Sequence, residues 1–243
     1  MKCTQMKVDV LVFEGCPHAD AALSLVKKVV GRLEPEAPVR RVEIDTPEKA
    51  AEIGFLGSPS VRINGDDIER RRTAKGALCC RTYSGNGVPP EWMVELGVIR
   101  ALKPRGILFL CAANSARSQM AEGIARSLAP EGINIMSAGS HPKSVRPEAI
   151  AVLKEIGIDI SGQWSKNVSE ILPSEVDTVI TLCAEEECPL FLGNARRVHW
   201  GLPDPAGVQG TEQEQLDEFR KTRDELKLGL SLLFSEEEHS TLF

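Results

Sequence analysis

The sequence lacks a long hydrophobic segment. None of its 243 residues forms a run that approaches the roughly 20 apolar residues of a membrane-spanning helix. The first residues, 1–13, contain only a short apolar run interrupted by Asp9, too short for the hydrophobic region of a signal peptide. From these absences we expect no membrane partner, no export and a cytoplasmic location.

Strong positive charge is also lacking. The formal net charge is -6, and residues 1–103 carry 16 Lys and Arg against 14 Asp and Glu, whereas residues 104–243 carry 13 against 21. Aromatic residues make up 5% of the chain, and none interrupts the small basic cluster at 70–72. Nucleic-acid-binding surfaces concentrate Lys and Arg on one face. We therefore expect no nucleic-acid partner.

The seven cysteines lack the pattern of a disulfide framework. An odd number of cysteines without an export signal fits catalytic or metal-binding thiols better than structural bridges. The hydrophobic content of 42% is ample for packed cores, and the length suggests one large or two small domains. Residues around Lys103-Pro104-Arg105 are typical of a linker, so we expect domains at 1–103 and 104–243.

The central motif is an eight-residue loop between an apolar run at 107–110, typical of a buried strand, and a helical pattern at 119–128. N–H groups of a loop that enters a helix converge on one point, which makes an anion site. The helix dipole, Arg117 and Ser118 favour a thiolate at Cys111, and Arg117 can grip a tetrahedral oxyanion through two N–H groups. The expected substrate-binding residues are Ala112, Ala113, Asn114, Ser115, Ala116, Arg117 and Ser118.

The second half alternates strands and helices. Strands are expected at 107–110, 133–137, 178–182 and 197–200, with helices at 119–128, 147–156 and 211–234. Thr211 and Glu214 have the spacing of a capping box at the start of the last helix. This order predicts an α/β domain with a four-stranded parallel sheet and helices on both faces, and the anion loop at the carboxyl edge of the strands.

Cys111, five residues, Arg117 and Ser118 after an apolar strand resemble the anion loop of the low-molecular-weight tyrosine phosphatase family. The run at 114–122, Asn-Ser-Ala-Arg-Ser-Gln-Met-Ala-Glu, resembles the thioredoxin-coupled arsenate reductase branch of that family. Asp204-Pro205 and two further cysteines, Cys183 and Cys188, fall where the family would place them. The resemblance covers residues 106–235 and implies reduction of arsenate, or binding of another small tetrahedral oxyanion, for arsenic detoxification.

The resemblance implies a role for each residue of this constellation. Cys111 attacks arsenate and forms a thiol-arsenate adduct, and Asp204 acts as general acid. Cys183 attacks Cys111 and releases arsenite, and Cys188 takes over the disulfide and presents a Cys183–Cys188 bridge to thioredoxin. Asn114 holds the loop conformation. No cofactor is expected beyond an external thiol reductant such as thioredoxin.

The spacing of Cys183 and Cys188 carries a conformational requirement. In a continuous helix, five residues correspond to about 7.5 Å of rise, which two sulfur atoms cannot bridge. A disulfide between these cysteines therefore requires the segment between them to unwind or loop out.

Two other functions remain open for the second half. The loop and Asp204 suffice for a tyrosine or small-phosphoester phosphatase, which forms a cysteinyl-phosphate. Only redox chemistry needs Cys183 and Cys188, so these two cysteines discriminate between the readings. A third interpretation is a protein that sequesters arsenite or a soft metal without turnover.

One position departs from the family pattern. Some members bind potassium near the loop through an asparagine, a glutamate, a serine and an aspartate. Asn114, Glu122 and Ser137 match, but Lys166 stands where the aspartate is expected. An ammonium group can replace the ion electrostatically, so we expect no bound metal and activity that does not depend on potassium.

The first half resembles a thioredoxin fold over residues 7–102. The expected order is a strand at 8–13, a cysteine turn, a helix at 19–33, a strand at 39–44, a helix from 47, a strand in 57–65 and a helix at 91–102. Pro59 occupies the place of the cis-proline of that fold.

This half departs from thioredoxins because Ala19, not cysteine, lies three residues after Cys16. Cys79 and Cys80 can supply a distant resolving thiol if the chain folds back. Three interpretations stand: a redox module that reduces the second domain, a thiol site for arsenite or a soft metal at Cys16, Cys79 and Cys80, and a redox-silent interaction domain.

Overall fold

The computed structural model describes residues 5–70, 78–83, 85–184, 191 and 193–234. The chain divides into two compact units, Met1–Leu102 and Lys103–Phe243. Each unit has its own sheet of four strands.

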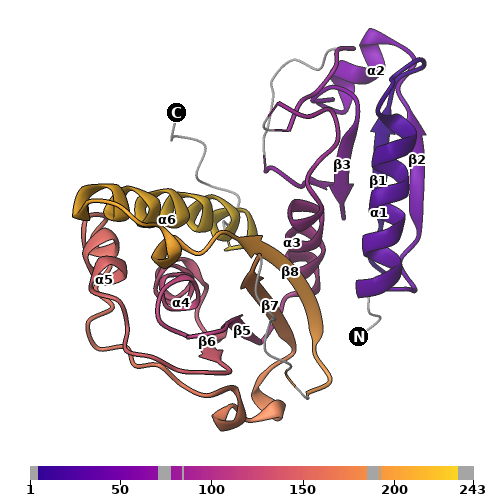
Figure 1. Cartoon of the computed structure of the whole chain (residues 1–243). Helices are drawn as coiled ribbons and strands as arrows, with labels where there is room; N and C mark the ends of the chain where they lie inside the picture. The colour runs from indigo at the N-terminus through magenta and orange to yellow at the C-terminus, as the bar shows by residue number, and fades with distance from the viewer. Residues whose placement is uncertain (1–4, 71–77, 84, 185–190, 192, 235–243) are drawn as a thin grey trace. The chain divides into compact units, whose positions relative to one another are not determined.

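The N-terminal unit combines a mixed sheet with three helices (Figure 1). Its elements are β1 (Val8–Val12), α1 (Ala19–Leu33), β2 (Val39–Glu43), α2 (Pro47–Glu52), β3 (Ser60–Ile63), β4 (Asp66–Asp67) and α3 (Glu91–Leu102). The sheet order is β2-β1-β3-β4, in which β1 and β2 are parallel and the other pairs antiparallel. Sequence patterning missed β4, because two residues are too few to show a period of two.

Helices cover both faces of this first sheet. Helix α3 packs on the face of Ile63, where a Cβ added at Gly97 would lie 3.1 Å from the Ile63 side chain. On the opposite face, Leu11 packs in a cluster with Ala50 of α2. The Ser58–Pro59 peptide bond just before β3 is cis.

The C-terminal unit is built on a parallel sheet. Its elements are β5 (Gly106–Cys111), α4 (Arg117–Leu128), β6 (Asn134–Gly139), α5 (Pro147–Lys154), the 3-10 turns η1 (Val168–Glu170) and η2 (Pro173–Glu175), β7 (Thr178–Cys183), β8 (Arg196–Leu202), the 3-10 turn η3 (Pro205–Gly207) and α6 (Glu212–Phe234). The order β6-β5-β7-β8, parallel throughout, confirms the predicted parallel sheet. Cys183 is the last residue of β7, whereas the sequence placed it just beyond the strand.

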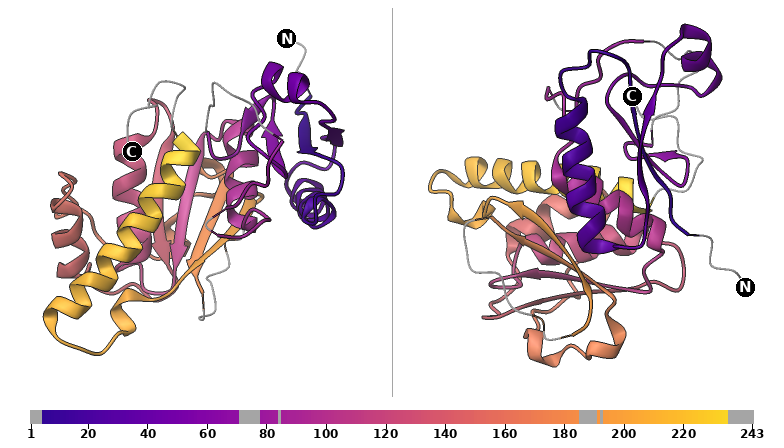
Figure 2. Two further views of the ribbon diagram at one scale, coloured as in Figure 1. Left: turned by 90° about the horizontal axis from the view of Figure 1, so that it is seen from above. Right: turned by 90° about the vertical axis from the view of Figure 1, so that its right-hand side faces the viewer.

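The helices of this unit were expected on both faces of the sheet, and the described residues show a different arrangement. Helix α4 packs on β5 and β6, and α5 and α6 pack beside α4 on the same side (Figures 1 and 2). On the other side, Leu108, Leu110 and Val179 are covered by Phe191 and by residues around η1 such as Val168. On this face, 3-10 turns and Phe191 cover the sheet in the described residues, where α-helices were predicted.

Helix α6 begins with the predicted capping box. The Glu214 amide donates to Thr211 Oγ1 at 3.3 Å, and the Thr211 amide donates to Glu214 Oε2 at 2.7 Å. These reciprocal bonds satisfy N–H groups at a helix start that have no intrahelical partner. Among the helices that the structure describes, none is long and apolar enough to cross a membrane.

Candidate active site

The loop at 111–118 surrounds a small pocket at the carboxyl edge of the parallel sheet. The pocket has a volume of about 40 Å³ and is lined by Cys111, Ala112, Ala113, Ser115, Ala116, Arg117 and Asp204. A cavity needs roughly 10–15 Å³ on this scale to hold one water molecule. The space therefore suits a small oxyanion. The Cys111 side chain lines it while the residue is only 2% exposed.

The carbonyl groups of the loop are held from outside the pocket. Backbone N–H groups of the segment at 141–146 bond three of them: His141 to Ala112, Lys143 to Ala113 and Arg146 to Ser115, each at 2.9 Å. The carbonyl of Asn114 accepts from Ser165 Oγ at 2.6 Å and from Gln119 Nε2 at 3.0 Å. Because these carbonyls are engaged by neighbouring segments, the loop N–H groups are left to serve as the donors that an anion cradle requires.

The Asn114 side chain fixes the orientation of the hydroxyl beside the nucleophile. Its Oδ1 accepts from the Lys166 backbone N–H at 2.7 Å, so its Nδ2 must be the atom that donates to Ser118 Oγ and Ser137 Oγ, both at 2.8 Å. Ser118 Oγ lies 2.9 Å from Cys111 Sγ. Either atom of this pair can be the donor, and the Ser118 hydroxyl can donate to the sulfur while it accepts from Asn114.

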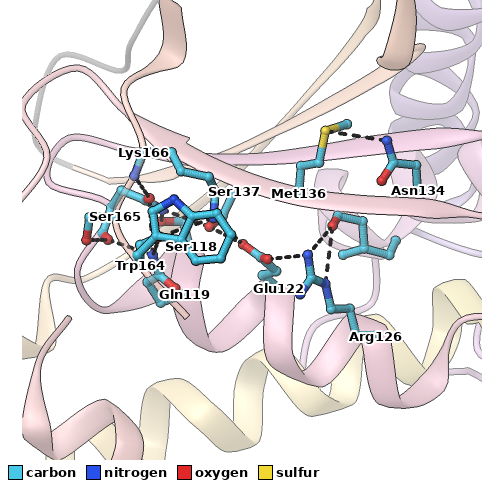
Figure 3. Close-up of polar contacts among 12 residues, drawn as sticks. Ser118, Gln119, Glu122, Arg126, Asn134, Met136, Ser137, Trp164, Ser165 and Lys166 are labelled. Atoms are coloured by element: carbon cyan, nitrogen blue, oxygen red, sulfur yellow. Dashed lines mark hydrogen bonds and ion pairs between the residues drawn. The ribbon is translucent and has the colours of Figure 1, made fainter. Parts of the chain in front are cut away.

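A buried carboxylate, Glu122, is joined to this hydrogen-bond network through Ser137 (Figure 3). Glu122, 1% exposed, accepts from Ser137 Oγ at 2.5 Å. It pairs with Arg126 at 2.6 Å and with Lys166 Nζ at 3.3 Å. The Lys166 ammonium also donates to the Trp164 carbonyl at 3.2 Å and lies 4.9 Å from the centroid of the Trp164 ring. Lys166 thus supplies a positive charge to Glu122, one of the three residues expected around a potassium ion.

Arg117 links the loop to the ends of two strands. Its Nη1 donates to the carbonyl of Leu202 at 2.9 Å and lies 3.5 Å from that of Leu182. Its Nη2 lies 3.5 Å from Asp204 Oδ1. The guanidinium therefore sits between the pocket, the Asp204 carboxylate and the residue just before Cys183.

Cys183 lies at the same edge as Cys111. It is 1% exposed and ends β7, the strand that pairs with β5. At this end, Trp200 and Gly201 of β8 stand opposite Leu182 alone, an irregularity typical of a β-bulge. A Cβ at Gly201 would lie 3.2 Å from Ala184 Cα, so glycine permits this close approach. Cys188, the third predicted thiol, lies outside the described residues.

The N-terminal unit has four cysteines, of which Cys3 lies outside the described residues and the other three lie on two loops. Cys16 is half-buried ahead of α1, and Cys79 and Cys80 are exposed. Within the described part of the chain, no three His, Cys, Asp or Glu side chains are arranged to hold a metal ion. The structure therefore gives no metal geometry to these three cysteines.

Sequence reasoning missed Gly139 at the end of β6. A Cβ there would lie 2.6 Å from the Ala112 carbonyl and 2.8 Å from the Asn114 amide, so only glycine lets β6 approach the loop. A lone glycine after a strand carries no such signal. The segment at 141–146 was missed because it acts through backbone N–H groups, which leave no signal in the sequence.

Comparison with known proteins identifies the C-terminal unit. Residues 106–240 match the model of the family described as low molecular weight phosphotyrosine protein phosphatase. The chain belongs to this family. The predicted resemblance to its arsenate reductase branch is confirmed by curated relatives. A protein named arsenate reductase from Halalkalibacterium halodurans is 45% identical over 122 residues, which are 49% of this chain and 88% of the relative.

Further relatives carry the same name. The arsenate reductase of Bacillus subtilis is 43% identical over 122 residues, again 49% of this chain and 88% of that protein. Among solved structures, an arsenate reductase in a phosphate-binding state is 36% identical, covers 54% of this chain and 96% of its own, and has a TM-score of 0.47.

Proposed function

We propose that the C-terminal unit reduces arsenate to arsenite and serves arsenic detoxification. The observation that carries the proposal is one buried thiol, Cys111, in an oxyanion-sized pocket and a second, Cys183, at the end of the neighbouring strand. The names of the curated relatives support arsenate as the substrate.

The first step is formation of a covalent adduct. The Cys111 thiolate attacks arsenic, an As–O bond breaks, and Asp204 donates a proton to the departing hydroxide. Arg117 and the loop N–H groups hold the remaining oxygens. Arg117 is suited to this task because it lies beside Asp204 and lines the pocket.

The second step transfers two electrons. Cys183 attacks Cys111 Sγ, an S–S bond forms, and the S–As electron pair stays with arsenic, which leaves as arsenite. Cys188 then attacks Cys183 and frees Cys111, which leaves a Cys183–Cys188 disulfide. A dithiol such as thioredoxin, or the N-terminal unit of the chain itself, reduces this bridge, so no other cofactor is needed. The relay needs its cysteines as reduced thiols, and the cytoplasm keeps thiols reduced, which supports a cytoplasmic location for a chain with seven cysteines.

The N-terminal unit is proposed to be a thioredoxin-like domain. The order strand, helix, strand, helix, two antiparallel strands and helix supports this assignment, together with helices on both faces of the sheet and the proline turn before β3.

A single-turnover experiment without reductant tests the proposed function. Wild type incubated with arsenate is expected to lose two thiols for each arsenite released, with one arsenite per enzyme from the reductase thiols alone and a second if the N-terminal unit reduces the bridge, while Cys183→Ser releases none. Phosphatase activity toward an aryl phosphate is expected to be weak and unchanged in Cys183→Ser, because phosphoryl transfer needs only the loop and Asp204. Vigorous phosphate hydrolysis without any arsenite would favour the phosphatase alternative. Loss of phosphatase activity in Cys183→Ser would contradict the assigned roles.

A further inference from the structure

Two cysteine-bearing segments of the N-terminal unit flank one residue, Ser58. The amide of Phe13, which lies three residues before Cys16, donates a hydrogen bond to Ser58 Oγ at 3.3 Å. On the other side, the Ser58 amide donates to the Cys79 carbonyl at 2.8 Å, and the Ser58 carbonyl accepts from the Arg81 amide at 2.9 Å. The chain thus folds back so that Cys80 forms a parallel bridge with Ser58.

The pairing distinguishes Cys80 from Cys79. Residues joined in a bridge direct their side chains to the same side, and neighbours along an extended chain direct theirs to opposite sides. The Cys80 side chain therefore shares the side of the Ser58 side chain, whose oxygen meets the segment leading to Cys16. Cys79 shares the opposite side with Arg81.

The contacts of Arg81 show which face of the sheet each of these two sides belongs to. Its guanidinium binds Ser60 Oγ at 2.8 Å and the Asp67 carboxylate at 2.6 and 2.7 Å. Ser60 is paired with Leu11, which packs against α2. Arg81 and Cys79 therefore belong to the α2 side of the sheet, and Cys80 to the side of α1, the helix that Cys16 precedes.

The segment that carries Cys80 is firmly anchored. Arg81, only 6% exposed, also pairs with Glu69 at 2.6 Å, and Tyr83 donates to the Pro59 carbonyl at 2.9 Å. Farther along, Gly87 packs directly on the His18 ring, since a Cβ there would lie 2.1 Å from it. The chain after Cys80 is thus held against the start of α1.

We propose that Cys16 and Cys80 form the redox-active dithiol of the N-terminal unit, and that Cys79 takes no part. This inference deepens the proposal that the unit donates electrons. The Cys16 thiolate attacks a protein disulfide, which breaks its S–S bond, releases one thiolate and forms a mixed disulfide. The Cys80 thiolate then attacks Cys16 Sγ, forms the Cys16–Cys80 bond and releases the second thiolate. The acceptor gains two electrons and the two protons of the N-terminal thiols.

The test uses the full chain with Cys111, Cys183 and Cys188 replaced by serine, so that the reductase thiols cannot interfere. The protein is equilibrated in glutathione redox buffers, its remaining thiols are trapped with a maleimide, and intact mass and peptide mapping identify the disulfide. Cys16 and Cys80 are expected to be lost together as one mapped bridge. Adding Cys79→Ser should leave the bridge intact, and adding Cys80→Ser should abolish it.

Other outcomes overturn the proposal. These are thiols that stay reduced or become singly glutathionylated, a bridge that contains Cys79, and a bridge abolished by Cys79→Ser but not by Cys80→Ser. Because no arsenate is present, this experiment can fail while arsenate reduction succeeds, and the reverse.

Discussion

At the residue scale, the site depends on a hydrogen-bond chain that ends at the nucleophile. The backbone N–H of Lys166 orients Asn114, Asn114 donates to Ser118, and Ser118 Oγ lies 2.9 Å from Cys111 Sγ, where it can donate to a thiolate. The sequence named Cys111 and Ser118, but the chain through Lys166 needed the fold, since Lys166 lies 52 residues from Asn114.

The hydroxyl beside the nucleophile can be removed directly. Ser118→Ala is expected to slow both arsenate reduction and alkylation of Cys111 by iodoacetamide at pH 7 by roughly tenfold or more, since a charge-assisted hydrogen bond is worth about 1.5–3 kcal/mol. Ser127→Ala is the control, because that hydroxyl lies farther along α4 and donates to the Ile124 carbonyl. Equal alkylation rates in wild type and Ser118→Ala would contradict this role of the hydroxyl.

Lys166 bears on the potassium question. Its ammonium already neutralises the buried Glu122, so initial rates of arsenate reduction should be the same in potassium chloride and in sodium chloride at equal ionic strength. Strong activation by potassium would show that the ammonium does not replace an ion.

The same lysine has a measurable effect on stability. Lys166→Met removes one of the two cations that pair with Glu122, and we expect a loss of about 1–3 kcal/mol in the free energy of unfolding. Urea denaturation measures this loss. Lys227→Met, at an exposed position of α6, should cost far less. Equal losses in the two variants would mean that the contact with Glu122 contributes nothing.

At the scale of elements, the loop depends on the strand beside it. Gly139→Ala places a methyl group 2.6 Å from the Ala112 carbonyl, so the loop must shift and arsenate reduction should fall by at least tenfold. Gly162→Ala is the matched control, because its Cβ meets nothing within 4 Å. Steady-state rates measure the loss of activity. An unchanged far-UV circular dichroism spectrum shows that the loss comes from displacement of the loop and not from unfolding. An unimpaired Gly139→Ala enzyme would show that the loop tolerates the shift.

Helices α5 and α6 are joined by an acid-sensitive contact. Hydrogen bonds from Arg220 and Arg223 to Glu155 lower the pKa of that carboxyl from 4.5 to about 2. A lowered pKa in the folded state gives stabilisation that is fully present above about pH 4.5 and is lost as the pH falls toward 2. The difference in unfolding free energy between wild type and Glu155→Gln should therefore shrink over this range in urea titrations. Glu131→Gln, at an exposed position, is the control, and a difference independent of pH would refute the contact.

The elements themselves were largely predictable. Periodicity and capping located α1, α3, the parallel strands and the start of α6, because these depend on local pattern. The sequence missed β4, the bulge opposite Leu182 and the face covered by 3-10 turns and Phe191. These features depend on pairing and packing between distant segments, which local pattern does not encode.

At the scale of the whole molecule, we propose complementary thiol chemistry for the two units. The site of the C-terminal unit could be predicted through Cys111, Arg117, Cys183 and Asp204, since each stands in a motif or at a strand end. The assignment of Cys80 over Cys79 in the N-terminal unit could not, because two adjacent cysteines look alike until the bridge to Ser58 and the contacts of Arg81 are known. In the account that follows from both, electrons pass from a dithiol to the reductase thiols and then to arsenate.

The most direct test of the central claim is arsenate-dependent oxidation of NADPH with thioredoxin and thioredoxin reductase supplied, comparing wild type with Cys188→Ser. We expect continuous turnover by wild type, and a halt after about one arsenite per enzyme in Cys188→Ser, because no thiol then remains to resolve the Cys111–Cys183 disulfide. A wild type that consumes no NADPH while it hydrolyses an aryl phosphate would contradict the account and identify the chain as a phosphatase.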